Sequence, residues 1–114
     1  MIVDPKQLNE MIQTLSQLYA DLYKKELEFQ KQLAKFILEV YSHKTVKIDN
    51  DQIVFDTDDG VKLSNETQRK AVIDLWKSNH PLYKEIREMK SKVKTLEMQR
   101  DLLMKLLDSK EELC

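Results

Sequence analysis

Two long stretches of this chain repeat apolar residues every seven positions, and this periodicity limits the folds that the chain can adopt. In the first stretch, two interleaved series share the repeat: Leu8, Leu15, Leu22, Phe29 and Phe36, with Ile12, Tyr19, Glu26, Leu33 and Val40. Two such series form the seam of a coiled coil. Asp4 and Pro5 are typical of a helix start, because an acid accepts from free N–H groups and proline lacks one. We therefore predict a long helix over residues 5–42.

The second stretch begins after Asn79-His80-Pro81 and predicts a long helix over residues 81–110. Its two series are Leu82, Met89, Leu96 and Leu103, with Ile86, Val93, Arg100 and Leu107. Proline starts a helix well but bends or breaks one when it lies inside. The series continues backwards through Leu75 and Val72, which favours a kink at Pro81 over a separate domain. A break at this point stays the alternative.

Residues 44–63 change to a period of two, which indicates β-strands. Val46 and Ile48 alternate with polar residues, and so do Ile53 and Phe55. Clusters of Asp, Asn and Gly separate these segments and are typical of tight turns. We predict a two- or three-stranded β-meander that needs a helix to cover one face.

The polar run Ser64-Asn65-Glu66-Thr67 marks the start of a further helix over residues 65–78. Asn65 with Gln68 three residues later is a capping-box arrangement, and Ser64 is a second candidate cap. Glu66 lies where the helix dipole favours an acid.

These elements define the predicted fold class: mainly α with a small β insert, an antiparallel helical hairpin or coiled coil. The chain has 114 residues, of which 34% are charged, with one glycine and two prolines, a composition typical of long helices. We expect a single domain, 1–114. Apolar residues off the seams would need cover, and they predict a homo-oligomer, a dimer or higher: Met11, Leu18, Leu27, Ile37, Met98 and Leu102.

Glu26 and Arg100 each occupy a seam position that a heptad usually gives to an apolar residue. A complementary pair there would fix the register or the partner. Direct pairing requires that residues 66–78 lie aside or that the pair forms between chains; separate side chains that reach for solvent are the alternative. The predicted interface residues are Leu15, Leu22, Glu26, Phe29, Trp76, Leu96, Arg100 and Leu103.

Several function classes find no support in the residues. The one cysteine, Cys114, has no disulfide or metal partner, and no apolar run approaches the roughly 20 residues that span a bilayer. The acidic insert, with Asp51 and Asp56, fails the EF-hand spacing, because from Asp56 the glycine falls fifth and the twelfth residue is Thr67. No nucleophile motif or phosphate loop accompanies His43 and His80. We expect no enzyme, cofactor or metal, no signal peptide or membrane segment, and a reducing, cytoplasmic setting.

The densest basic patch is a candidate nucleic-acid contact. Lys84, Arg87, Lys90 and Lys94 follow one helical stripe at which phosphates could bind. Glu85 and Glu88 dilute the charge, and the net charge of the whole chain is −1. A solvated coiled-coil flank is therefore the alternative interpretation.

The run LSNETQRKAVIDLWKSNHPLYKEI combines a capped helix, a proline break and a long coiled coil. Over roughly residues 60–110 it resembles small uncharacterised proteins of Firmicute phages and related mobile elements. That resemblance implies a setting in DNA metabolism or host takeover, within the bacterial host cytoplasm. The order of long helix, β insert and long helix is similar to prefoldin-type chaperone subunits.

The expected function is that of a non-enzymatic, oligomeric coiled-coil protein that binds a macromolecule. Its partner would be a replication, recombination or host-defence protein, with or without contact to single-stranded DNA. A prefoldin-like holdase that binds unfolded polypeptide is the alternative.

Overall fold

A computed structural model describes residues 4–50 and 52–112, without the side chains of 109–112. Asp51 and Cys114, which enter the metal and disulfide interpretations above, lie outside the described residues. The chain forms two compact units, one made of the residues up to Lys25 and from Ile86 onward, the other of Glu26–Glu85. Each unit is described by itself.

Three helices account for most of the chain, and their bounds agree with the sequence patterns. Helix α1 spans Pro5–Ser42, α2 spans Glu66–Asn79 and α3 spans Pro81–Glu112. Asp4 caps α1 as expected, because its Oδ1 accepts from the N–H of Lys6 at 2.9 Å. Both α1 and α3 contribute residues to each unit.

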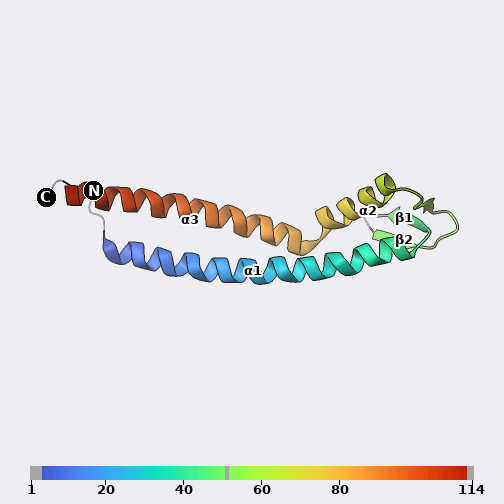
Figure 1. Ribbon diagram of the computed structural model, residues 1–114, viewed down its shortest axis with the longest axis horizontal. Coiled ribbons are helices and arrows are strands. Elements are labelled where there is room, and N and C mark those ends of the chain that lie inside the picture. The colour runs from blue at the N-terminus through green and yellow to red at the C-terminus, as the bar shows by residue number, and fades with distance from the viewer. Residues whose placement is uncertain (1–3, 51, 113–114) are drawn as a thin grey trace. The chain divides into compact units, whose positions relative to one another are not determined.

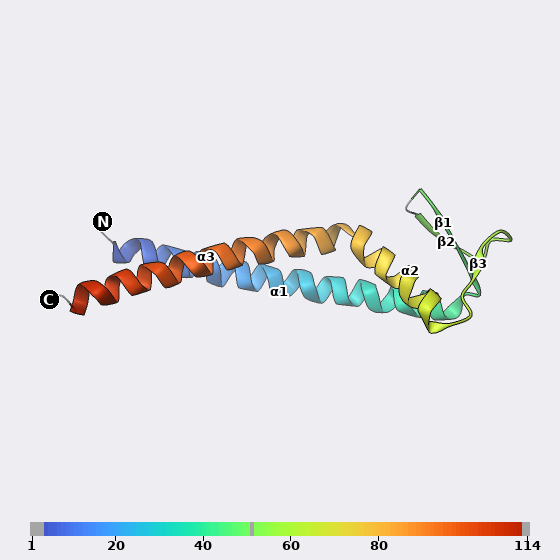
Figure 2. The ribbon, with the colours of Figure 1, turned by 90° about the horizontal axis from the view of Figure 1, so that it is seen from above.

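The first unit pairs the beginning of α1 with the greater part of α3. The two helices run side by side in opposite directions in both views (Figures 1 and 2). Leu15, Ile86 and Val93 of this unit are buried, and all three are seam positions. Ile12 and Tyr19 belong to the same seam, yet each is 42% exposed, so burial follows the heptad pattern only in part. The predicted antiparallel pairing of helices is confirmed for this unit.

The second unit contains a three-stranded antiparallel sheet: β1 spans Thr45–Asp49, β2 spans Gln52–Phe55 and β3 spans Val61–Lys62. The strand order is β2-β1-β3, so β1 is central and the predicted meander order is wrong.

The chain leaves β2 at Asp56, whose φ of 58° lies in the left-handed region, and then crosses β1. Glycine suits the crossing, because a Cβ at Gly60 would lie 3.0 Å from the carbonyl oxygen of Val46. After the crossing, β3 pairs with the free side of β1 and not with β2.

The core of the second unit joins the end of α1, the sheet and α2. Its buried residues are Phe36, Val40, Val46, Leu63 and Val72. Ile53, Phe55, Ile73 and Trp76 pack against them. The helices therefore cover the face of the sheet that carries Val46, as the sequence requires of so short a sheet.

His80 separates α2 from α3, so the alternative of a break at Pro81 is the observed one. The backbone of His80 is extended, with φ −75° and ψ 132°. Its side chain caps the N-terminus of α3, because Nδ1 accepts a hydrogen bond from the N–H of Leu82 at 3.1 Å. Nε2 then carries the proton and donates to Oε1 of Gln32 on α1 at 2.7 Å. A single residue thus ends one helix, caps the next and binds α1.

Candidate protein-interaction site

Hydrogen bonds at the N-terminal cap of α2 fix where this helix starts next to the sheet. Asn65 accepts from the N–H of Gln68 at 2.9 Å, which confirms the predicted N-cap. The Gln68 side chain reaches back to the backbone N–H of Ser64, also at 2.9 Å. The reciprocal bond therefore closes on the residue before the cap and not on the cap itself. Both bonds fix the residue at which α2 leaves the sheet.

A cluster of three side chains fastens the start of α2 to the end of α1. The Tyr41 hydroxyl donates to one oxygen of Glu66 at 2.7 Å, and Arg69 donates to the other at 3.0 Å. The guanidinium of Arg69 lies 4.8 Å from the centre of the Tyr41 ring. The hydrogen bonds from Tyr41 and Arg69 lower the pKa of Glu66, and the bond to Glu66 raises the pKa of Tyr41.

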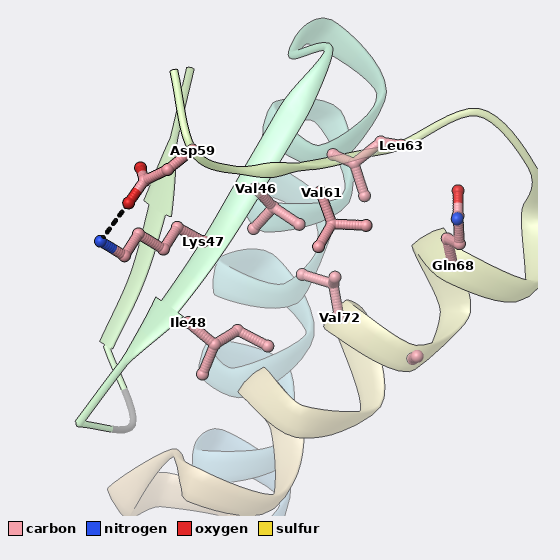
Figure 3. Close-up of a pocket in the computed structure, with 9 residues that line it drawn as sticks. Val46, Lys47, Ile48, Asp59, Val61, Leu63, Gln68 and Val72 are labelled. Atoms are coloured by element: carbon pink, nitrogen blue, oxygen red, sulfur yellow. Dashed lines mark hydrogen bonds and ion pairs between the residues drawn. The ribbon is translucent and has the colours of Figure 1, made fainter. Parts of the chain in front are cut away.

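On one side of its crossing over the sheet, α2 leaves a hollow, which we call the apolar hollow. It has a volume of about 410 Å³ and opens between β1, β3 and α2 (Figure 3). Its lining residues are Val46, Lys47, Ile48, Asp59, Val61, Leu63, Gln68, Ala71 and Val72. Val46, Val61 and Val72 point into the space between β1 and α2 in Figure 3.

Two apolar side chains of the hollow remain accessible from outside. Ile48 is 51% exposed and Val61 is 62% exposed, although Val46 between them in the sheet is buried. Ile48, Val46 and Val61 share one face, because Val46 pairs with Val61 and residues two apart in a strand point the same way. The hollow thus has a buried floor and an accessible apolar rim.

The charged groups at this hollow neutralise each other. The Lys47 ammonium lies 2.6 Å from Oδ2 of Asp59, and the two side chains are 41% and 65% exposed. The hydrogen bond from Lys47 lowers the pKa of Asp59. Gln68 is occupied by its capping bonds to Ser64. What the hollow offers to a ligand is therefore apolar surface, with a neutral ion pair at its edge.

The histidines, a residue type common in catalysis, have structural partners. His43 stacks on Phe55 with ring centroids 4.6 Å apart, and its Nδ1 lies 2.6 Å from Oδ2 of Asp56. That hydrogen bond lowers the pKa of Asp56. Within residues 4–50 and 52–112, no three His, Cys, Asp or Glu side chains are placed to hold a metal ion. In the same ranges, no helix is long and apolar enough to cross a bilayer.

The four predicted basic residues all lie exposed along α3. Arg87, Lys90 and Lys94 belong to the first unit, whereas Lys84 lies near the end of the second. Arg87 and Lys90 also take part in interactions within the protein. None of the four lines the apolar hollow, and their contact with nucleic acid stays a prediction.

The predicted interface residues divide between the two units. Leu15, Leu22, Leu96, Arg100 and Leu103 lie in the first unit, and Glu26, Phe29 and Trp76 lie in the second. Arg100 binds Asp101 at 3.2 Å and also interacts with Tyr19. Direct pairing of Glu26 with Arg100 stays a hypothesis.

Phe29 and Trp76 are part of an aromatic group that joins α1 to α2. Their rings stack with centroids 5.8 Å apart, and Phe29 also contacts His80 and Tyr83. These side chains pack against one another within the second unit.

The sequence did not single out the residues of the apolar hollow. The alternating pattern places Val46 and Ile48 on one face of a strand, which is the available signal. The hollow also requires that Val61 lie next to Val46. This pairing depends on the observed strand order, which differs from that of the predicted meander.

No protein-family model, curated protein or solved structure matches this chain. Function is therefore inferred from the side chains and the geometry of the two units. The resemblances to phage proteins and to prefoldin-type subunits stay hypotheses.

Proposed function

We propose that this chain is a non-enzymatic interaction protein that binds another protein through the apolar hollow of its second unit. The observation that carries the proposal is the accessible rim of Ile48 and Val61 above a buried floor. Half-exposed apolar side chains around a concave surface are typical of protein-binding sites.

The size of the hollow indicates what part of a partner it accepts. Its volume of about 410 Å³ lies at the lower end of small-ligand pockets, so it suits one or two apolar side chains of a partner. Full burial of one such side chain contributes about 1.5–3 kcal/mol. Contacts outside the hollow must supply the rest of a stable complex.

Val61→Arg tests the proposal, because Val61 is the most exposed apolar residue of the rim. The matched control is Val54→Arg: Val54 is 41% exposed, but it pairs with Lys47 on the other face of the sheet. Both variants and the native chain are used to capture proteins from a bacterial lysate, with quantification by mass spectrometry. Proteins that Val61→Arg loses and Val54→Arg retains support the proposal; equal capture by all three chains contradicts it.

The setting and assembly of this function are part of the same proposal. The phage resemblance supports a replication, recombination or host-defence protein as the partner, in the cytoplasm of a bacterial host. Leu27, Met98 and Leu102 are 41%, 66% and 58% exposed, which supports self-association through apolar surface off the seams. A holdase activity is the alternative use of such surface, and suppression of the aggregation of an unfolded protein distinguishes it.

Single-stranded DNA binding is a second candidate function, and one observation favours it. Arg87, Lys90 and Lys94 are all exposed on the same helix of the first unit, at spacings that place them near one face. None of the basic residues lines the apolar hollow, so this contact is compatible with protein binding there.

A further inference from the structure

Strand β2 has an open outer edge. Within residues 4–50 and 52–112 it pairs only with β1, because the strand order is β2-β1-β3. The other edge strand, β3, has two residues and includes Lys62, whereas β2 has four residues, none of them charged. Natural sheets usually protect an edge by shortening it or by placing charges on it. The edge of β2 lacks both protections.

The register identifies the backbone groups that point outward from β2. The N–H of Asp56 donates to the carbonyl of Thr45 at 3.1 Å, so these two residues form a hydrogen-bonded pair. Such pairs alternate along an antiparallel ladder. The N–H and C=O groups of Ile53 and Phe55 therefore point away from β1. Among the described residues, no backbone or side-chain hydrogen bond reaches them from outside the sheet.

A second hollow lies beside this edge, on the face of the sheet that the helices cover. We call it the edge hollow. It has a volume of about 370 Å³ and lies between Ile53 and Phe55 on one side and Phe36, Trp76 and His80 on the other. A strand added to β2 would direct the residues opposite Ile53 and Phe55 toward the same face, because directly paired residues share a face. Alternate side chains of the added strand would thus enter the edge hollow.

The charge of the edge hollow defines the side chain that it prefers. Of the described residues that line it, Glu39 is the one that carries a full charge. The side chain of Glu39 is exposed and has no hydrogen bond or ion pair among the described residues, and Asn79 beside it is also exposed. A lysine or arginine can lay its aliphatic stem along Ile53 and Phe55 while its charged end meets Glu39.

We propose that the edge of β2 and the edge hollow together bind an extended peptide segment of a partner protein that carries a lysine or arginine. The segment adds as a fourth strand, with hydrogen bonds to Ile53 and Phe55, and its basic side chain enters the edge hollow toward Glu39. A second copy of this chain is the less suitable occupant. Its own β2 offers glutamine, isoleucine, valine and phenylalanine, and so no basic side chain for Glu39. This site is separate from the apolar hollow and does not depend on the proposed function.

The test uses the full chain, labelled with nitrogen-15, and a short blocked peptide in which valine and threonine alternate around a central lysine. We expect amide shift changes at Ile53 and Phe55, a change at the Trp76 indole, and slower amide exchange at the two β2 residues. A peptide with glutamate in place of the lysine should bind about tenfold more weakly, as should a peptide methylated on the backbone nitrogens that face β2.

Glu39→Lys is the matching change in the protein and should also weaken the lysine peptide about tenfold, because it places like charges together. Glu10→Lys is the control, since Glu10 is exposed on α1 in the first unit and should leave the affinity unchanged. Equal binding to both variants would overturn the proposal, and so would shift changes at Val61 and Val72, which line the other hollow. Shift changes at β2 that grow with protein concentration without peptide would assign the edge to a second copy and also overturn it.

Discussion

The ring of Trp76 lies against the ring of Phe36, with centroids 4.8 Å apart and planes 9° apart. Trp76 also stacks on Phe29, which lies about two turns earlier on α1, with ring centroids 5.8 Å apart. Phe29 and Phe36 are seven residues apart and are both buried. One tryptophan of α2 therefore packs against two successive heptad positions of α1 and links the two helices in the second unit.

Replacement of Trp76 or Phe36 by alanine should strongly destabilise the second unit. Each change removes a large ring from a packed stack, and such truncations cost about 3–5 kcal/mol of unfolding free energy. Urea unfolding followed by circular dichroism measures the loss. Tyr23→Ala is the control, because Tyr23 is 67% exposed, and we expect a change below about 1 kcal/mol. An unfolding midpoint of Trp76→Ala equal to that of Tyr23→Ala would contradict the importance of the stack.

The cap of α2 gives a second, smaller prediction. Asn65→Ala removes the oxygen that accepts from the N–H of Gln68, and the loss of such a cap costs about 1 kcal/mol. Thr67→Ala, at an exposed position in the first turn, controls for the general effect of alanine there. In thermal unfolding, the native chain and Thr67→Ala should have similar midpoint temperatures, and the midpoint of Asn65→Ala should be clearly lower. Identical transitions for the two variants would show that the cap contributes little.

Helix limits were predictable because the signals that set them are local. Asp4, Pro5 and Asn65 act on backbone groups within three residues, so the sequence alone reveals them. The strand order was not predictable in this way. It depends on the turn at Asp56 and on the close passage of Gly60 over β1, which is a contact between segments distant in sequence.

The two hollows were beyond sequence analysis for the same reason. Val61 and Val72 line the apolar hollow only because β3 pairs with β1 and α2 crosses the same face. From the sequence alone, Glu39 is an ordinary surface residue of a long helix. Its place beside Ile53 appears only once α1 is packed against the sheet.

Acid should destabilise the second unit through Asp56. The hydrogen bond with His43 lowers the pKa of Asp56 in the folded chain below its ordinary value of 3.8. The pair therefore stabilises the fold above that value, and the stabilisation disappears as the pH falls through the lowered pKa.

Unfolding free energies of the native chain and of Asp56→Asn, measured at decreasing pH, test this effect. Asparagine tolerates the left-handed backbone of this position, so the variant changes the charge and keeps the turn. The two chains should differ above pH 3.8 and converge in stronger acid. Asp74→Asn controls for the loss of an exposed acid on α2. A constant difference between the native chain and Asp56→Asn throughout would exclude the pair as the cause.

A charged residue in the seam of the first unit should destabilise the helices of this unit. Leu15 is 2% exposed, so Leu15→Asp places an unpaired carboxylate among apolar side chains and should reduce the helical signal in circular dichroism. Leu96→Asp lies at a half-buried seam position and should act in the same direction. Leu102→Asp is the matched control, because Leu102 is 58% exposed. Unchanged melting of Leu15→Asp would mean that the seam does not hold this unit together.

Binding of single-stranded DNA, if it uses the basic stripe, must depend on salt. Each phosphate contact releases counterions, so the affinity of three or four contacts should fall steeply between low and moderate salt. Lys90→Glu combined with Lys94→Glu should remove most of the mobility shift of a labelled single strand. Lys6→Glu combined with Lys31→Glu makes the same charge change at exposed positions of α1 and should retain it. Binding that does not change with salt would contradict a contact with phosphates. Equal weakening by both double variants would show that net charge rather than the stripe attracts DNA.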